Sequence, residues 1–210
     1  MFTHMATRKY QKTRRAEQQA ETRQRIIEAM VALHREVGPA ATTISAIAER
    51  AGVERLTVYR HFADEAAMFQ ACSAHFATEV APPDPAAWAD IADPAERLRE
   101  ALLVFYEYYR RGEDMLTHVH RDVPRMPALA DIMAPWDSLV DAVRDDMVRA
   151  WAARGQARTR LAAAVAHALR FDTWRSLARA EGLPDADAAD LMVALAQAAT
   201  DAAPGRARRA

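Results

Sequence analysis

Residues 43–62, TISAIAERAGVERLTVYRHF, decide the fold of this 210-residue chain. Apolar side chains recur at helical spacing on both sides of Gly52, which predicts two short helices joined by a tight turn. Ala48 is small where the two helices must cross closely, and Gly52 is able to adopt the positive φ that such a turn needs. Val58 and Phe62 are spaced to hold the second helix against the first. The segment therefore predicts a helix-turn-helix unit.

The side chains that the second helix does not need for packing suit the surface of a DNA duplex. An arginine at a helix start reaches guanine O6 and N7, a leucine contacts a thymine methyl, and hydroxyl or imidazole groups donate to phosphates. Thr42 or Thr43 is expected to cap the preceding helix, whose exposed N–H groups form a phosphate site. The predicted DNA-binding residues are Arg14, Arg15, Thr42, Thr43, Ser45, Arg55, Leu56, Thr57, Tyr59, Arg60 and His61.

Upstream of this unit lies a basic arm that we expect to be disordered. Its charged side chains are Arg8, Lys9, Lys12, Arg14 and Arg15. Such an arm is able to enter a minor groove or to lie along the DNA backbone. The alternative is an ordinary solvated run of charge.

The stretch resembles TetR-family (tetracycline-repressor-like) transcriptional regulators. The resemblance covers about residues 20–76 and includes ATTISAIAERAGV, LTVYRHF and an acid-capped helix that begins at Asp64. It implies a three-helix DNA-binding domain, a linking fourth helix, and a C-terminal helical domain that dimerises and binds a small effector. Glu54 and Glu65 depart from the family pattern, because many relatives have Ser or Thr where Glu54 stands and Lys where Glu65 stands. Ser45 stands where some relatives have a basic residue, so the bases that are read cannot be carried over.

Composition and charge agree with a two-part chain. The 51% hydrophobic content is enough for a real core, and the formal net charge is only -1. Residues 1–63 nevertheless hold 11 basic and 6 acidic side chains, so a basic head precedes an acidic body. Cys72 is the single cysteine, which excludes an intrachain disulfide, and no apolar run approaches the length of a membrane span. We expect a cytoplasmic protein with no membrane partner.

Glycines and prolines fall between the helical segments, which predicts an all-α fold of about nine or ten helices. We expect a DNA-binding domain over residues 1–66, an effector-binding and dimerisation domain over 67–205, and a disordered tail over 206–210. Several helix faces are expected to be buried, among them Ile26, Met30, Leu33 and Val37. A helix should begin at Pro94, with Asp93 as its cap and Glu96 as the partner of a capping box. The segments 159–181 and 187–200 each read as one helix and are predicted to form half of an intersubunit four-helix bundle, with burial inside a monomer as the alternative.

The body also contains aromatic and methionine side chains that are able to line an effector pocket, although such a stripe is more often core. The candidates are Phe105, Tyr109, Met115, His120, Met133, Trp136, Phe171 and Trp174. Met126, His118, His167, Arg170 and Asp172 are further candidates for the same cavity. This composition favours a largely apolar or aromatic effector.

The sequence lacks GxSxG, GxGxxG, P-loop and CxxC motifs, so we expect neither an enzyme nor a cofactor or metal site. The predicted function is a homodimeric, effector-responsive repressor that binds a pseudo-palindromic operator. The alternatives are an activator, a regulator without an effector, or a helical ligand-binding or interaction protein whose DNA-binding head has weakened.

Overall fold

The computed structural model describes residues 3–201, and within this range it contains ten α-helices and no strand, which confirms the all-α prediction. The helices are α1 (Thr3–Glu36), α2 (Ile44–Ala51), α3 (Arg55–His61), α4 (Glu65–Glu79), α5 (Pro94–Arg111), α6 (Glu113–Asp122), α7 (Pro127–Ala150), α8 (Gly155–Ala168), α9 (Phe171–Arg175) and α10 (Asp185–Asp201). The tail predicted over 206–210 lies outside the described residues. No helix within residues 3–201 is long and apolar enough to cross a membrane.

The chain forms two compact units. The head contains the residues up to Glu79 together with Asp114–Ile132, and the body contains Val80–Glu113 and the residues from Met133 onward. The sequence placed the boundary near residue 66, whereas the head continues to Glu79 because α4 packs on α1. Helix α6 follows the body's α5 in the chain, yet it packs within the head.

The head is built as its sequence pattern indicates. Ile26, Met30, Ile47, Val58 and Phe62 are at most 3% exposed and form its core. The C-terminal cap of α2 is Gly52, which has φ 65 and ψ 41, and its N–H donates to the carbonyl groups of Ala48 and Glu49. This left-handed conformation is the one that glycine adopts without steric cost, so the turn between α2 and α3 follows from the residue at that position.

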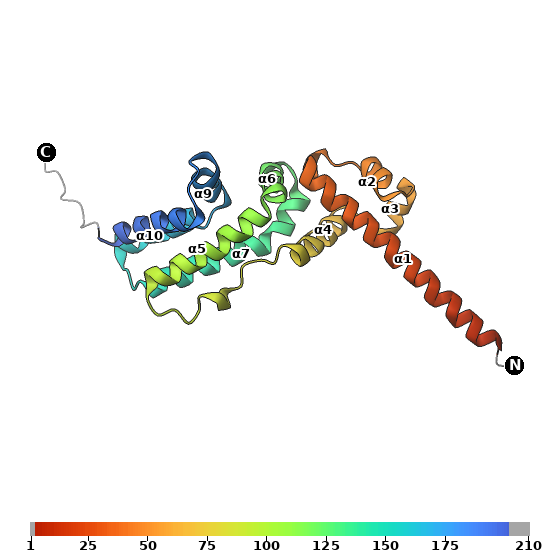
Figure 1. Ribbon diagram of the computed structural model, residues 1–210, viewed down its shortest axis with the longest axis horizontal. Helices are drawn as coiled ribbons and strands as arrows, with labels where there is room; N and C mark the ends of the chain where they lie inside the picture. The colour runs from red at the N-terminus through yellow and green to blue at the C-terminus, as the bar shows by residue number, and fades with distance from the viewer. Residues whose placement is uncertain (1–2, 202–210) are drawn as a thin grey trace. The chain divides into compact units, whose positions relative to one another are not determined.

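Helix α1 differs from its prediction at both ends. The arm expected to be disordered is helical, since α1 begins at Thr3, and its N-terminal turns extend past α2 and α3 (Figure 1). The side chains of residues 3–12, including those of Arg8, Lys9 and Lys12, lie outside the described residues. At the other end Val37 is 43% exposed and does not belong to the buried stripe. The helix stops at Glu36, and His34 is buried instead.

Helix α6 is attached to the end of α1 by polar contacts. Asp122, which is 2% exposed, accepts a hydrogen bond of 3.0 Å from the Ala40 N–H group. Arg121 pairs with this carboxylate at 2.7 Å and donates to the Val37 carbonyl at 2.9 Å. His118 Nδ1 lies 3.0 Å from the His34 carbonyl. These contacts fix the segment that leads into α2.

The body is organised around α5. Asp93 caps this helix by accepting from the N–H groups of Ala95 and Glu96, as predicted. Phe105, Tyr109 and other residues of one face of α5 are buried, and α5 packs against α9 and α10. The ring of Trp136 in α7 lies 5.7 Å from that of Phe105, centroid to centroid.

The segment predicted as one helix over residues 159–181 is interrupted. Helix α8 ends at Ala168, and the chain resumes as α9 and then as a π-helical segment, Ser176–Ala180. At the interruption the hydroxyl groups of Tyr106 and Tyr109 donate to the carbonyl groups of Ala168 and Leu169. These contacts with α5 satisfy carbonyl groups that the end of a helix leaves without partners. Beyond the break, α10 packs along α8.

Candidate nucleic-acid interface

Helix α3 has one buried and one exposed face. Val58 is fully buried and the capping residue Phe62 is 3% exposed, whereas Leu56 and Tyr59 are 56% and 55% exposed. Arg55 and Arg60 are exposed, Thr57 and His61 are half-buried, and no residue between Arg55 and His61 is acidic. A short helix that keeps large side chains and cations in solvent, while its other face is anchored, is suited to enter a major groove.

The N-terminus of α2 provides a second element of the surface. Thr43 is its cap, and its hydroxyl oxygen accepts from the Ala46 N–H group at 3.1 Å. Thr42 has a different role, because its hydroxyl donates to the Gly38 carbonyl at 2.8 Å in the turn before α2. Ser45 is exposed in the first turn. The structure thus assigns the cap, which the sequence left open between Thr42 and Thr43.

The two acidic departures have different local consequences. Glu54 occupies the cap position of α3 but makes no side-chain cap hydrogen bond, as its poor capping preference predicts. Asp64 accepts from the Ala67 N–H group at 2.8 Å and caps α4. Glu65 follows as the first residue of α4 and is exposed.

A groove of about 640 Å³ lies between α1 and α3. It is lined by Arg15, Gln18, Gln19, Ala20, Thr22, Arg23, Thr57, Arg60 and His61. The structure thus brings together the predicted residues Arg15, Thr57, Arg60 and His61, while Arg14 is not in this lining. Gln19 and Arg23 were not among the predicted residues, although their spacing from Arg15 places all three near one face of a helix.

A buried polar contact supports the head beneath this surface. His34 Nδ1 lies 3.2 Å from the thiol sulfur of Cys72, and the His34 ring contacts that of Phe69 at 5.8 Å between centroids. Burial lowers the pKa of His34 to about 4, although the charge of Asp122 acts in the opposite direction. Burial also raises the pKa of the Cys72 thiol to about 12. Both groups are therefore neutral near pH 7, and the contact holds α4 against α1 without a buried charge.

The effector candidates do not form a single cluster. Phe105, Tyr109, Trp136, Phe171 and Trp174 form a connected group of rings, with centroids 5.5–6.2 Å apart. Met133 is half-buried in the body, whereas Met115 and His120 belong to the head. Four of these five rings are nearly fully buried, and Trp136 is half-buried. This packing favours the core role, which is the more frequent one for such a stripe.

A cavity of about 410 Å³ in the body has a different lining. It contains His167, Arg170, Asp172, Thr173, Ser176, Leu177 and Met192. The first three were candidates for the polar groups of a pocket, and Thr173 lies 3.3 Å from His167, Oγ1 to Nδ1. Ser176 and Leu177 were not among the candidates, because the π-helical segment that contains them was not predicted.

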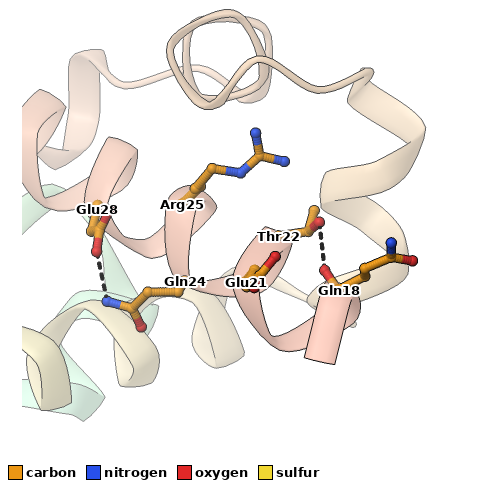
Figure 2. Close-up of a pocket in the computed structure, with 6 residues that line it drawn as sticks. All are labelled: Gln18, Glu21, Thr22, Gln24, Arg25 and Glu28. Carbon is orange, nitrogen blue, oxygen red and sulfur yellow. Dashed lines mark hydrogen bonds between the residues drawn. The ribbon is translucent and has the colours of Figure 1, made fainter. Parts of the chain in front are cut away.

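A further groove lies along another face of α1 (Figure 2). Its lining combines Arg25 with Glu21 and Glu28, and Gln24 donates to Glu28 at 2.9 Å. Two carboxylates stand against one cation in this lining, so this face of α1 is less suited to a polyanion than the face toward α3.

Comparison with known proteins identifies the head. Residues 26–72 match the sequence profile described as bacterial regulatory proteins, tetR family. The chain carries a TetR-family head. The matched region begins within α1 and ends within α4, so it contains the whole helix-turn-helix unit. Arg15, Gln19 and Arg23 precede it.

Solved structures show that the TetR-like fold extends beyond the head. A TetR-like transcriptional regulator from a Rhodococcus species has a TM-score of 0.62 and 20% identity, over 84% of this chain and 93% of that chain. NalD of Pseudomonas aeruginosa, the secondary repressor of the MexAB-OprM multidrug efflux pump, has a TM-score of 0.57 and 20% identity, over 87% and 96% of the two chains. No curated protein matches the sequence. The architecture is that of TetR-family transcriptional regulators.

Proposed function

We propose that this protein is a homodimeric transcriptional repressor that binds a pseudo-palindromic DNA operator and is released by a small, largely apolar effector. The observation that carries the DNA-binding part is the exposed face of α3. Leu56 and Tyr59 are more than half exposed beside Arg55 and Arg60, on a helix anchored by the buried Val58. Two such helices, one from each protomer, would enter successive major grooves about 34–36 Å apart.

The dimer part rests on α10. Leu191 and Leu195 are 47% and 43% exposed and lie one helical turn apart, and Ala194 and Ala198 on the same helix are also exposed. Because α8 already packs along α10, the same two helices of a second copy would complete a four-helix bundle. We expect wild-type protein to sediment as a dimer and Leu195→Asp to sediment as a monomer. A wild-type mass near 23 kDa at micromolar concentration would contradict this interface.

The effector part rests on the connected rings of α5, α7 and α9. Apolar or aromatic compounds that separate these rings would bind a state in which the body is packed differently. If they bind that state more tightly than the DNA-binding state, they shift the protein away from DNA. Trp136 and Trp174 report on this region by fluorescence. We expect such compounds to quench this fluorescence saturably and to weaken DNA binding. A screen in which quenching and DNA affinity vary independently would contradict an effector at this site.

Arg55 provides the test of direct DNA reading. Its replacement by Ala is expected to weaken operator binding by about 1–3 kcal/mol and to relax the preference at one base position, because a bidentate arginine contact is lost. Glu54 and Glu65 favour a second candidate, a ligand-binding protein with a weakened head. Wild-type protein that binds duplex DNA without sequence preference, and Arg55→Ala that binds equally, would support this second candidate.

A further inference from the structure

The N-terminal half of α1 carries a basic face beside the recognition helix. Arg15, Gln19 and Arg23 follow one another at intervals of four residues, so they lie near one face of the helix. With Arg60 and His61 of α3 they line the groove of about 640 Å³ between the two helices. Three arginines and no acidic residue are among the nine that line it.

The neighbouring face of the same helix lacks this bias. Its groove contains Glu21 and Glu28 together with Arg25 (Figure 2). Gln18 and Thr22 belong to both grooves and lie on the border between the two faces. The distinction is therefore one of charge within a single helix, and not a general basicity of the N-terminus.

The cations of the α3-facing groove do not have equivalent roles. The Arg23 guanidinium lies over the ring of Phe62, 5.0 Å from its centroid, and this contact helps to hold the end of α3. Arg15 and Arg60 are exposed, and their positively charged ends are available to an anion that enters the groove. Gln19 also lines the groove and is exposed. Its side-chain amide is a further hydrogen-bond donor.

We propose that the groove between α1 and α3 binds the sugar-phosphate backbone that flanks the major-groove contact, with Arg15 as its principal phosphate ligand and Gln19 as a second donor. This inference rests on the proposed DNA-binding function and adds a second contact surface to it. The α1 side of this surface, with Arg15, Gln19 and Arg23, lies before the region that matches the tetR family, which starts at residue 26. A groove lined by cations and amides, with few apolar side chains, fits a phosphodiester strand, because phosphate contacts need charge and donors rather than base edges.

Continuity of α1 gives the contact its rigidity. Because α1 is one helix from Thr3 to Glu36, the position of Arg15 is fixed by the buried C-terminal half, which includes Ile26 and Met30. A rigid helix places a cation against DNA with less loss of conformational entropy than a disordered arm. The proposal therefore separates two adjacent arginines: Arg15 lies in the groove, and Arg14 points about 100° away around the helix.

The test compares Arg15→Ala with Arg14→Ala. The two variants lose the same charge one residue apart in the same helix, so nonspecific electrostatics and helix propensity are matched. Binding to a duplex is measured as a function of salt concentration, both for the best sequence from a selection and for an unrelated duplex. Arg15→Ala is expected to reduce the log-log salt slope by about 0.9 for each bound head, with an affinity loss of about threefold to tenfold at 0.1 M salt. Arg14→Ala is expected to change the slope by less than half as much.

Gln19→Glu tests the groove in the opposite direction, by placing a carboxylate in it. Gln156→Glu, at an exposed position of α8, is the control with the same change in net charge. We expect Gln19→Glu to bind at least threefold more weakly than Gln156→Glu at 0.1 M salt, since a carboxylate in the groove repels the phosphates. Far-UV circular dichroism of all four variants checks that α1 remains helical.

Equal salt slopes for Arg14→Ala and Arg15→Ala, together with equal affinities for the two glutamate variants, would overturn the proposal. Failure of the proposed function gives a different result, because the wild-type protein itself would then bind DNA without sequence preference. In that case the unrelated duplex still tests the groove, since phosphate binding does not depend on sequence.

Discussion

The contact between Gly38 and α6 allows one substitution to be predicted in detail. Gly38 has φ 94 and ψ 162, a region that is essentially restricted to glycine. A Cβ atom at this position would lie 2.8 Å from Asp122 Oδ2, and it would also collide with Arg121 Nη2. Arg121 is exposed and is able to move, whereas Asp122 is 2% exposed and holds the Ala40 N–H group.

We expect Gly38→Ala to reduce the free energy of unfolding by about 2.5–6 kcal/mol. Backbone strain in this region accounts for about 1–3 kcal/mol. Displacement of Asp122 weakens a buried hydrogen bond to a charged acceptor, which accounts for about 1.5–3 kcal/mol more. Gly52→Ala is the matched control in the same head, because Gly52 also has a positive φ but nothing lies within 4 Å of its added Cβ. That variant should lose only the strain of about 1–2 kcal/mol.

Urea unfolding followed by far-UV circular dichroism measures both losses. Asp122→Ala completes a double-mutant cycle with Gly38→Ala, because removal of the carboxylate also removes its collision with the added Cβ. In the Asp122→Ala background, the loss of unfolding free energy caused by Gly38→Ala should be smaller than in the wild type by about 1 kcal/mol or more. Equal losses for Gly38→Ala and Gly52→Ala, with an additive cycle, would refute the reasoning that α6 restricts this turn.

Two further predictions concern buried polar groups. The folded state holds the pKa of His34 near 4, below its ordinary value of 6.5. The free energy of unfolding is therefore fully retained above pH 6.5 and decreases as the pH falls toward 4. The total loss is about 3 kcal/mol. Urea midpoints measured between these pH values should fall more steeply for the wild type than for His34→Gln, and parallel curves would contradict this. Tyr109→Phe should destabilise by about 1–3 kcal/mol, because the buried Leu169 carbonyl loses its donor. Tyr59→Phe should not destabilise the protein, because the Tyr59 ring is 55% exposed. Equal thermal midpoints for the two variants would be inconsistent with a stabilising hydroxyl at Tyr109.

Local patterns were sufficient for the helix-turn-helix unit. The spacing of Ile47, Val58 and Phe62 places their side chains in one core, and Gly52 determines the turn, because each effect acts within a few residues. The caps at Thr43 and Asp93 are equally local. For this reason Arg55, Leu56, Tyr59 and Arg60 were correctly placed on the exposed face of α3, whereas Thr57 and His61 are half-buried.

Features that depend on contacts between distant residues were not predicted. Ala40 and Asp122 are 82 residues apart, and nothing in the pattern of α6 indicates that it packs in the head. The interruption after Ala168 involves the hydroxyl groups of Tyr106 and Tyr109, which are about 60 residues earlier in the chain. Periodicity describes which face of a helix is apolar, but it does not tell which other element covers that face or where a distant donor ends the helix.

The most direct test of the central claim is selection of bound duplexes from a random DNA pool by the purified full-length protein at near-physiological salt. We predict enrichment of an inverted repeat whose half-sites are centred about one helical turn, or a multiple of it, apart, because two copies of α3 must enter major grooves on one face of the duplex. Arg55→Ala, run in parallel, should lose the preference at one position of each half-site. A pool that remains random after repeated rounds, although the protein binds DNA in a salt-dependent manner, would contradict a sequence-specific regulator.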